Sequence, residues 1–201
     1  MIRILIAEDQ AMMRGALTVL LNLEPDMEVV AEVSDGDGIL DAVARTTPDV
    51  ALLDIELPGM SGLEACRRIG LEHPDCRRVI VTTFGRPGYL RRAMEAGARG
   101  FLVKDRPVDG LARAIRAVVA GETVVDPDLA SAALRAGGSP LTDRERDVLV
   151  AAEDGATVAE IADRLHLAQN TVRNYLSAAI GKTATRNRSA AARVARDRGW
   201  L

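Results

Sequence analysis

Three acidic side chains stand where they could share one divalent cation. Glu8 and Asp9 directly follow an apolar run near the N-terminus, and Asp54 closes another apolar run. Carboxylates that crowd together repel one another unless a cation neutralises them, and an all-oxygen ligand set suits Mg²⁺. A metal beside an aspartate favours phosphoryl transfer to that carboxylate, so this pattern predicts Asp54 as a nucleophile.

Two further residues could serve the same chemistry. Thr82 offers a hydroxyl near the end of a fourth apolar run, and Lys104 offers an ammonium group at the end of a fifth. The lysine would stabilise negative charge on the group being transferred. A single acidic residue at a strand end is most often an ordinary loop or capping residue. Five chemically matched residues, each at the same end of its strand, favour a shared site.

The first 120 residues alternate short apolar runs with helical patterns. This alternation predicts a doubly wound α/β fold whose five-stranded parallel sheet is covered by helices on both faces. Right-handed crossovers bring the carboxyl ends of the strands to one edge, where the five residues would meet. The expected strands are 2–7, 29–33, 50–54, 79–83 and 100–104, and the expected helices are 11–23, 38–46, 62–71, 89–96 and 108–120.

The rest of the chain shows helical patterns only. Gly121 is expected to end the fifth helix, and a linker with one short helical stretch follows. Thr142 and Thr157 each precede a glutamate by three residues, which predicts two helices that begin with capping boxes. A short turn at 166–168 and two more helices, 169–180 and 189–198, complete a helix-turn-helix plan. The predicted divisions are a domain at 1–120, a linker at 121–139 and a small all-α domain at 140–201.

Charge is distributed unevenly along the chain. The whole chain carries a formal charge of −3, but residues 168–201 hold seven Lys or Arg against Asp197 alone. A basic segment in an acidic protein is typical of a face that meets nucleic-acid phosphates. No apolar stretch is long enough to span a bilayer. Cys66 and Cys76 lack metal-site spacing, so we expect free thiols and a cytoplasmic protein.

The third helix of the C-terminal region has one apolar and one polar face. Val172, Leu176 and Ala179 are spaced to pack inward, and the opposite face would enter a major groove. Ala168 provides no capping side chain, and Asn170 could move the helix start by two residues. Arg173 can make bidentate base contacts. The expected groove-facing residues are Gln169, Asn170, Arg173, Asn174 and Ser177, and the expected phosphate contacts are Thr171, Tyr175, Lys182, Arg186 and Arg188.

The first 120 residues resemble the receiver domains of bacterial response regulators. The resemblance rests on four stretches: Ile6-Ala7-Glu8-Asp9, Leu52-Leu53-Asp54-Ile55-Glu56-Leu57-Pro58-Gly59-Met60-Ser61-Gly62, Val81-Thr82-Thr83-Phe84, and Phe101-Leu102-Val103-Lys104-Asp105. It implies that Asp54 is the phosphoacceptor and that Glu8, Asp9, Asp54 and the main-chain carbonyl of Glu56 hold Mg²⁺. It also implies that Thr82 is a switch hydroxyl, that Phe101 is an aromatic rotor coupled to it, and that Lys104 pairs with the phosphate.

The C-terminal residues resemble the DNA-binding domains of the LuxR/NarL class. The stretches that carry this resemblance are Leu141-Thr142-Asp143-Arg144-Glu145-Arg146-Asp147-Val148-Leu149, Thr157-Val158-Ala159-Glu160-Ile161-Ala162 and Thr171-Val172-Arg173-Asn174. Together the two resemblances imply a NarL/FixJ-type response regulator. They imply a sensor histidine kinase as partner, dimerisation on phosphorylation, and binding to promoter DNA to regulate transcription.

Two other interpretations remain open from the sequence. A doubly wound sheet with a nucleophilic aspartate also describes haloacid-dehalogenase-type phosphatases. Their nucleophile follows the first strand in an Asp-x-Asp pattern, whereas this strand ends Glu8-Asp9-Gln10. The second interpretation is a receiver that no longer accepts phosphate, in a protein that binds DNA constitutively. The full set of site residues argues against it.

Overall fold

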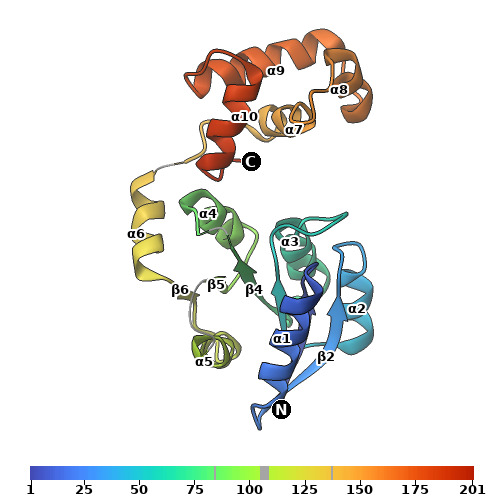
Figure 1. Cartoon of the computed structure of the whole chain (residues 1–201), viewed down its shortest axis with the longest axis vertical. Helices are drawn as coiled ribbons and strands as arrows, with labels where there is room; N and C mark the ends of the chain where they lie inside the picture. Colours follow the sequence, from blue (N-terminus) through green and yellow to red (C-terminus); the bar gives the residue numbers. More distant parts are fainter. Residues whose placement is uncertain (84, 105–108, 137) are drawn as a thin grey trace. The chain divides into compact units, whose positions relative to one another are not determined.

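The computed structural model describes residues 1–83, 85–104, 109–136 and 138–201 (Figure 1). Phe84, residues 105–108 and Gly137 lie outside the described residues, so the predicted loop after Lys104 and the predicted helix start at 108 are not covered. The chain divides into two compact units. One comprises Met1–Gly85 and Leu90–Ser131, and the other comprises Arg86–Tyr89 and Ala132–Leu201.

The first unit is built on one parallel sheet with the strand order β2-β1-β3-β4-β5-β6. All of its strand pairs run parallel, which confirms the predicted doubly wound fold. The sixth strand was not predicted, because its two residues are too few to show a pattern and lie inside the predicted linker. The strands are β1 (Ile2–Ala7), β2 (Met27–Val33), β3 (Val50–Leu53), β4 (Arg77–Thr82), β5 (Gly100–Val103) and β6 (Val124–Val125).

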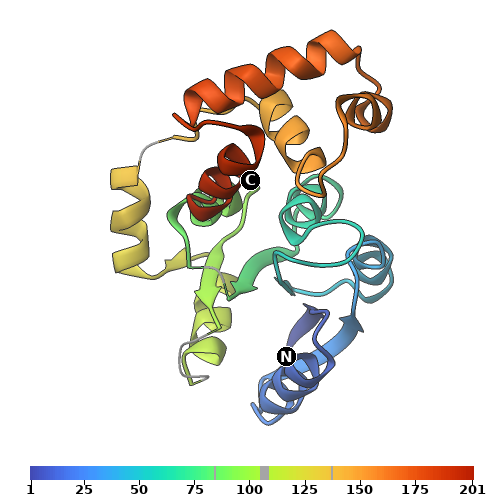
Figure 2. The ribbon, with the colours of Figure 1, turned by 45° about the horizontal axis from the view of Figure 1, so that its top comes forward.

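Helices cover both faces of this sheet (Figure 1; Figure 2). On one face, Leu17 and Leu21 of the first helix and Ile115 and Val118 of the fifth share a core with inward-facing strand residues. Two other helices, α2 and α3, contribute buried residues that lie outside this core and cover the opposite face. The helices of this part of the chain are α1 (Ala11–Asn22), α2 (Ile39–Thr46), α3 (Gly62–Glu72), α4 (Pro87–Glu95), α5 (Asp109–Val119) and α6 (Pro127–Ala136), of which α4 and α6 have residues in both units.

Both cysteines of the chain lie in this unit as buried free thiols, as the sequence predicted. Burial raises the pKa of Cys66 to about 11 and the pKa of Cys76 to about 12. Because the thiolate is the reactive form, neither cysteine is a nucleophile near neutral pH.

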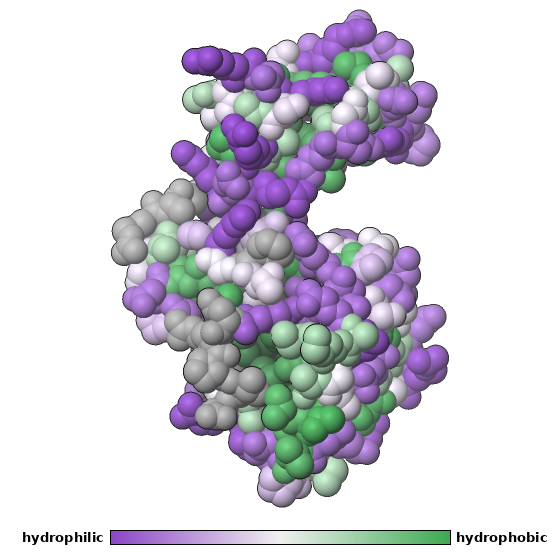
Figure 3. Space-filling view, viewed as in Figure 1, coloured by the Kyte–Doolittle hydropathy of each residue, from purple (hydrophilic) through white to green (hydrophobic). Residues whose placement is uncertain are grey.

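The outer face of α1 is apolar although it is exposed. Met12, Val19 and Leu20 of α1 and Leu23 directly after it are exposed, and Met12 is 87% exposed. The space-filling view shows a green patch on the front of this unit (Figure 3). We call these four residues the α1 stripe.

The C-terminal unit contains a helical core. Both predicted capping boxes are present: Thr142 with Glu145 opens α7, and Thr157 with Glu160 opens α8. The predicted inward residues of the third helix are all buried. Trp200, near the C-terminus, is buried in the same core. The helices are α7 (Asp143–Ala151), α8 (Val158–Leu165), α9 (Gln169–Lys182) and α10 (Arg188–Asp197), and α9 is the long orange helix of Figure 2.

Within the described ranges, no helix is both long enough and apolar enough to span a membrane.

Candidate functional site

The three acidic residues predicted to share a cation lie together. One carboxylate oxygen from each of Glu8, Asp9 and Asp54 falls within a group whose members are at most 4.8 Å apart. The neighbouring strands β1 and β3 bring them together, and the main-chain N–H of Asp54 donates to the carbonyl of Ala7 at 3.0 Å. Glu8 and Asp54 are buried, whereas Asp9 is exposed.

Lys104 places its ammonium group between the two buried carboxylates. Its Nζ lies 2.6 Å from Oε2 of Glu8 and 2.7 Å from Oδ2 of Asp54, and its side chain is almost fully buried. Burial alone would lower the pKa of Lys104. The hydrogen bonds to Asp54 and Glu8, with the charges of both carboxylates, outweigh burial and raise that pKa. The ammonium therefore stays charged at neutral pH and offsets part of the negative charge of the site.

The main chain fixes the second oxygen of Asp54. The N–H of Ile55 donates to Oδ1 at 2.6 Å. Gly62, at the start of α3, lies against the main chain of Asp54, because a Cβ atom there would stand 1.7 Å from the Asp54 carbonyl oxygen. This close approach explains why the Asp54 to Gly62 stretch requires glycine at its end.

A neighbouring arginine supports Glu8. The Nη1 of Arg14 donates to the main-chain carbonyl of Glu8 at 2.6 Å. This contact was not predicted, because a side chain on α1 reaching back to a strand end leaves no periodic signal in the sequence.

The donor set fits a hard divalent cation. All three side chains offer carboxylate oxygen, with no sulfur or imidazole ligand among them, and this is the chemistry that Mg²⁺ prefers. The side chain of Glu56 is exposed. The role of its main-chain carbonyl as a further ligand stays a prediction.

The two predicted switch residues lie on the same face of the sheet. Ile80 pairs with Phe101 in the β4–β5 register, so Thr82, two residues after Ile80, shares the face of Phe101. Val79 and Val81 point to the opposite face, into the core formed with α1 and α5. Thr82 and Phe101 are fully buried. Their location agrees with coupled movement, which stays a prediction.

The first turns of α9 present an exposed polar face. Gln169, Asn170, Arg173, Asn174 and Ser177 are all exposed, as expected for residues that face a groove. The guanidinium of Arg173 donates to Oδ1 of Asn170 at 2.8 Å and more weakly to Oε1 of Gln169 at 3.4 Å. Thr171 and Tyr175 are half-buried beside them.

The start of α9 differs from one expectation. The helix begins at Gln169, and Ala168 occupies the N-cap position without a side-chain hydrogen bond. The prediction that Asn170 shifts the helix start is therefore wrong. Its amide oxygen instead accepts from Arg173, and this contact requires Asn170 to lie inside the helix, one turn before Arg173.

Two of the three cations expected to meet the DNA backbone already have partners within the protein. Lys182 donates to Oε2 of the buried Glu145 at 2.7 Å, and Arg188 donates to the carbonyl of Ala156 at 2.6 Å. Arg186 is exposed in the segment between α9 and α10. DNA contact by all three residues stays a prediction.

Both halves of the chain match known protein families. Residues 4–116 match the response regulator receiver domain, and residues 139–195 match the bacterial regulatory proteins of the luxR family. The chain is a response regulator of the LuxR family. It regulates transcription through a helical DNA-binding domain that follows its receiver domain.

Relatives of this response regulator match along its whole length. It is 46% identical to the transcriptional regulatory protein DesR of Bacillus subtilis (strain 168) over 201 residues, which is all of both chains. A crystal structure of a LuxR-family two-component response regulator from Aurantimonas sp. SI85-9A1 is 32% identical. That match covers 66% of this chain and 95% of the other with a TM-score of 0.63.

A third comparison shows the fold only. RcsB from Salmonella enterica serovar Typhimurium, solved bound to promoter rprA in the presence of phosphomimetic BeF3-, is 21% identical to this response regulator. The match has a TM-score of 0.72 and covers 96% of this chain and 97% of RcsB.

The ion pair between Lys182 and Glu145 has a testable effect on stability. We expect Lys182→Met to lower the free energy of unfolding by about 1–2 kcal/mol at pH 7, because the buried carboxylate loses its cation but keeps the N–H of Thr142. Urea unfolding followed by circular dichroism measures this change. An equal stability of the two proteins at pH 7 would show that the pair contributes nothing.

This effect depends on pH in a defined direction. Burial would raise the pKa of Glu145, but hydrogen bonds from Lys182 and Thr142 with the charge of Lys182 lower it below the ordinary value of 4.5. A lowered folded-state pKa stabilises the protein above the unfolded pKa, and this contribution disappears as the pH falls through the folded value. The difference between wild type and Lys182→Met should therefore shrink below pH 4.5.

Proposed function

We propose that a sensor histidine kinase phosphorylates Asp54 in the presence of Mg²⁺, and that the phosphoryl group controls dimerisation and sequence-specific binding to promoter DNA. The observation that carries this proposal is the position of the Asp54 carboxylate. It is buried, its oxygens are held by the Ile55 N–H and the Lys104 ammonium, and two further carboxylates lie beside it.

The residues of the site divide the chemistry between them. An oxygen of Asp54 forms a bond to phosphorus while the bond between phosphorus and the nitrogen of the kinase histidine breaks, leaving the electron pair on that nitrogen. Lys104 pairs with the negative charge on the transferring group. Glu8, Asp9, Asp54 and the Glu56 carbonyl would hold Mg²⁺, which supplies charge neutralisation when bound.

Phosphorylation would then change the sheet face that carries Thr82 and Phe101. A phosphoryl group adds about −1.5 to −2 charge and three acceptor oxygens. The Thr82 hydroxyl would donate to one of these oxygens, and Phe101 would move into the space that Thr82 leaves. Because both side chains are fully buried, movement of either would require its neighbours to repack.

The C-terminal unit would bind the promoter DNA. In this proposal Arg173 and Asn174 read base edges, while Gln169, Asn170, Thr171, Tyr175, Ser177, Lys182, Arg186 and Arg188 complete the DNA contacts. A structure of two RcsB dimers bound to two parallel DNAs shows this general fold in a dimeric, DNA-bound form, and it supports the same arrangement here. A dimer on paired half-sites strengthens the binding of a small domain.

The proposal is tested with the full-length protein, acetyl phosphate and Mg²⁺. Intact mass spectrometry should show a gain of one phosphoryl group, and sedimentation should show a shift from monomer to dimer. A chelator in place of Mg²⁺ should prevent both changes. Unchanged mass with Mg²⁺ and phosphodonor present would overturn phosphorylation as the switch and favour constitutive DNA binding. A mass gain without dimerisation would overturn only the dimerisation step.

A further inference from the structure

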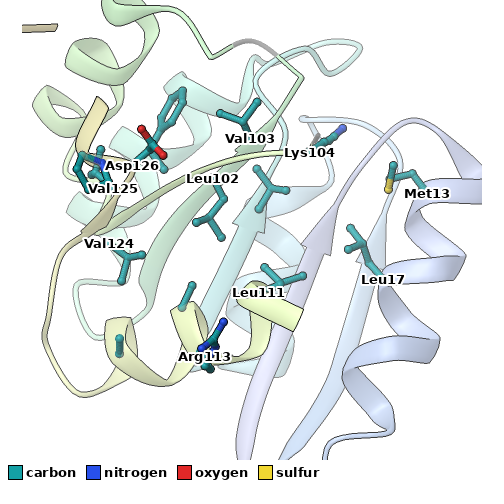
Figure 4. A pocket seen from close by; sticks show the side chains of 16 residues that line it. Met13, Leu17, Leu102, Val103, Lys104, Leu111, Arg113, Val124, Val125 and Asp126 are labelled. Atoms are coloured by element: carbon teal, nitrogen blue, oxygen red, sulfur yellow. The ribbon is translucent and has the colours of Figure 1, made fainter. Parts of the chain in front are cut away.

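A cavity of about 750 Å³ opens in the first unit between α1, α5, β5 and the turn from β6 into α6 (Figure 4). Its walls include the apolar side chains of Met13, Leu17, Leu102 and Leu111. Protein interiors are packed with few voids larger than a water molecule, and a volume of this size lies within the range of about 300–1,000 Å³ that holds small molecules. The cavity is therefore large enough for an organic ligand.

Small residues on one face of α5 leave room for the cavity. Gly110, Ala114 and Ala117 line it, and their spacing of four and three residues puts them on one face of the helix. A leucine at either alanine would extend into the space that these residues leave.

The C-terminal half of α5 is held against the sheet, so the helix is not free to close over the gap. Ile115 and Val118 are fully buried. Arg116 donates to Asp26 at 2.8 Å and to Glu24 at 2.7 Å, which ties α5 to the turn before β2. These contacts hold the part of α5 that carries Ala114 and Ala117.

Among the described residues that line the cavity, Arg113 is an exposed cation, and within that part of the chain its guanidinium makes no hydrogen bond or ion pair. Lys104 also lines the cavity, but its ammonium is held by Glu8 and Asp54. The carboxylate of Asp126 accepts from the N–H of Leu129 at the start of α6. An anionic group at the mouth would therefore meet Arg113.

We propose that this cavity binds a small organic anion with an apolar, ring-sized body, which lies among the α1, β5 and α5 side chains while its acidic group pairs with Arg113. The proposal does not depend on phosphorylation of Asp54. Because Lys104 belongs both to the cavity wall and to the acidic site, occupancy would also alter the rate of phosphoryl uptake.

The probe for the test is anilinonaphthalene sulfonate, which combines an apolar ring system with an anionic group. Fluorescence titration of the full-length protein should show one saturable site. Ala114→Leu and Ala117→Leu should each weaken binding roughly tenfold or more by filling the cavity. Arg113→Gln should weaken it by about threefold to fivefold, with the loss disappearing at high salt.

The matched control is Met12→Gln on the α1 stripe, an exposed apolar surface that could also attract the dye. Unchanged binding in Met12→Gln supports the cavity. Binding that survives both leucine variants, or that is lost in Met12→Gln, would overturn the proposal.

A measurement on the wild type avoids any folding defect of the leucine variants. Methyl NMR should show dye-induced shifts at Leu17, Leu102 and Leu111. Shifts confined to Val19, Leu20 and Leu23 would place the dye on the α1 stripe and contradict the proposed site.

Discussion

The Asp54→Asn protein is expected to take up no phosphoryl group from acetyl phosphate under conditions in which the wild type gains one. The amide keeps the size of the side chain but lacks the negatively charged oxygen that acts as the nucleophile. Glu8 is buried in the same cluster and has Lys104 on one oxygen and the N–H of Gln10 at 3.3 Å from the other. Asp54 likewise has Lys104 on one oxygen and the N–H of Ile55 on the other, so the Asp54 variant tests which of the two carboxylates accepts the phosphoryl group. Intact mass spectrometry measures the difference.

The matched control for this prediction is Asp9→Asn. Asp9 is exposed and belongs to the proposed metal ligands but not to the nucleophile. Its variant should require more Mg²⁺ yet still carry the phosphoryl group on Asp54, as peptide mapping would show. Phosphoryl uptake by Asp54→Asn at the wild-type rate would move the nucleophile to another residue and refute the assignment.

Arg173→Ala should remove part of the discrimination between the preferred DNA site and unrelated DNA. A bidentate contact to a base edge contributes about 1–3 kcal/mol of discrimination, so affinity for the preferred site should fall by about fivefold to 150-fold. The guanidinium is already oriented by Asn170 and Gln169, which reduces the entropy lost when it binds. Selection from random duplexes defines the preferred site, and titration at several salt concentrations gives both affinities.

Arg186→Ala is the control for this second prediction. Arg186 lies beyond α9, where a contact to the phosphate backbone is expected. Its loss should weaken binding to all DNA alike and reduce the slope of log K against log salt by about 1. If Arg173→Ala instead weakened every duplex equally, the first turns of α9 would be contacting phosphates and the proposed groove-facing side would be incorrect.

Much of the first unit could be predicted, because its signals are local and repeated. Each strand is a short apolar run, and the topology of a parallel sheet brings the carboxyl ends of β1 and β3 together without any knowledge of contacts. Glu8, Asp9 and Asp54 therefore met as expected. The capping boxes at Thr142 and Thr157 could be predicted equally well, since a capping box is contained within four residues.

The remaining features depend on contacts between distant residues. Strand β6 forms only because two residues after α5 pair with β5. Lys182 contacts Glu145, 37 residues earlier in the chain, and no pattern marks the two as partners. From the sequence, Asn170 could equally be the N-cap of α9 or a hydrogen-bond acceptor for Arg173. Because α9 starts at Gln169, Asn170 lies inside the helix and accepts from Arg173.

The ammonium of Lys104 also bears on what the metal does over a working cycle. It offsets part of the charge of two buried carboxylates through contacts of 2.6 and 2.7 Å, and so reduces their repulsion in the folded state. Under the proposed function, Mg²⁺ would serve phosphoryl transfer to Asp54, while Lys104 would steady the buried carboxylates whether or not the ion is bound.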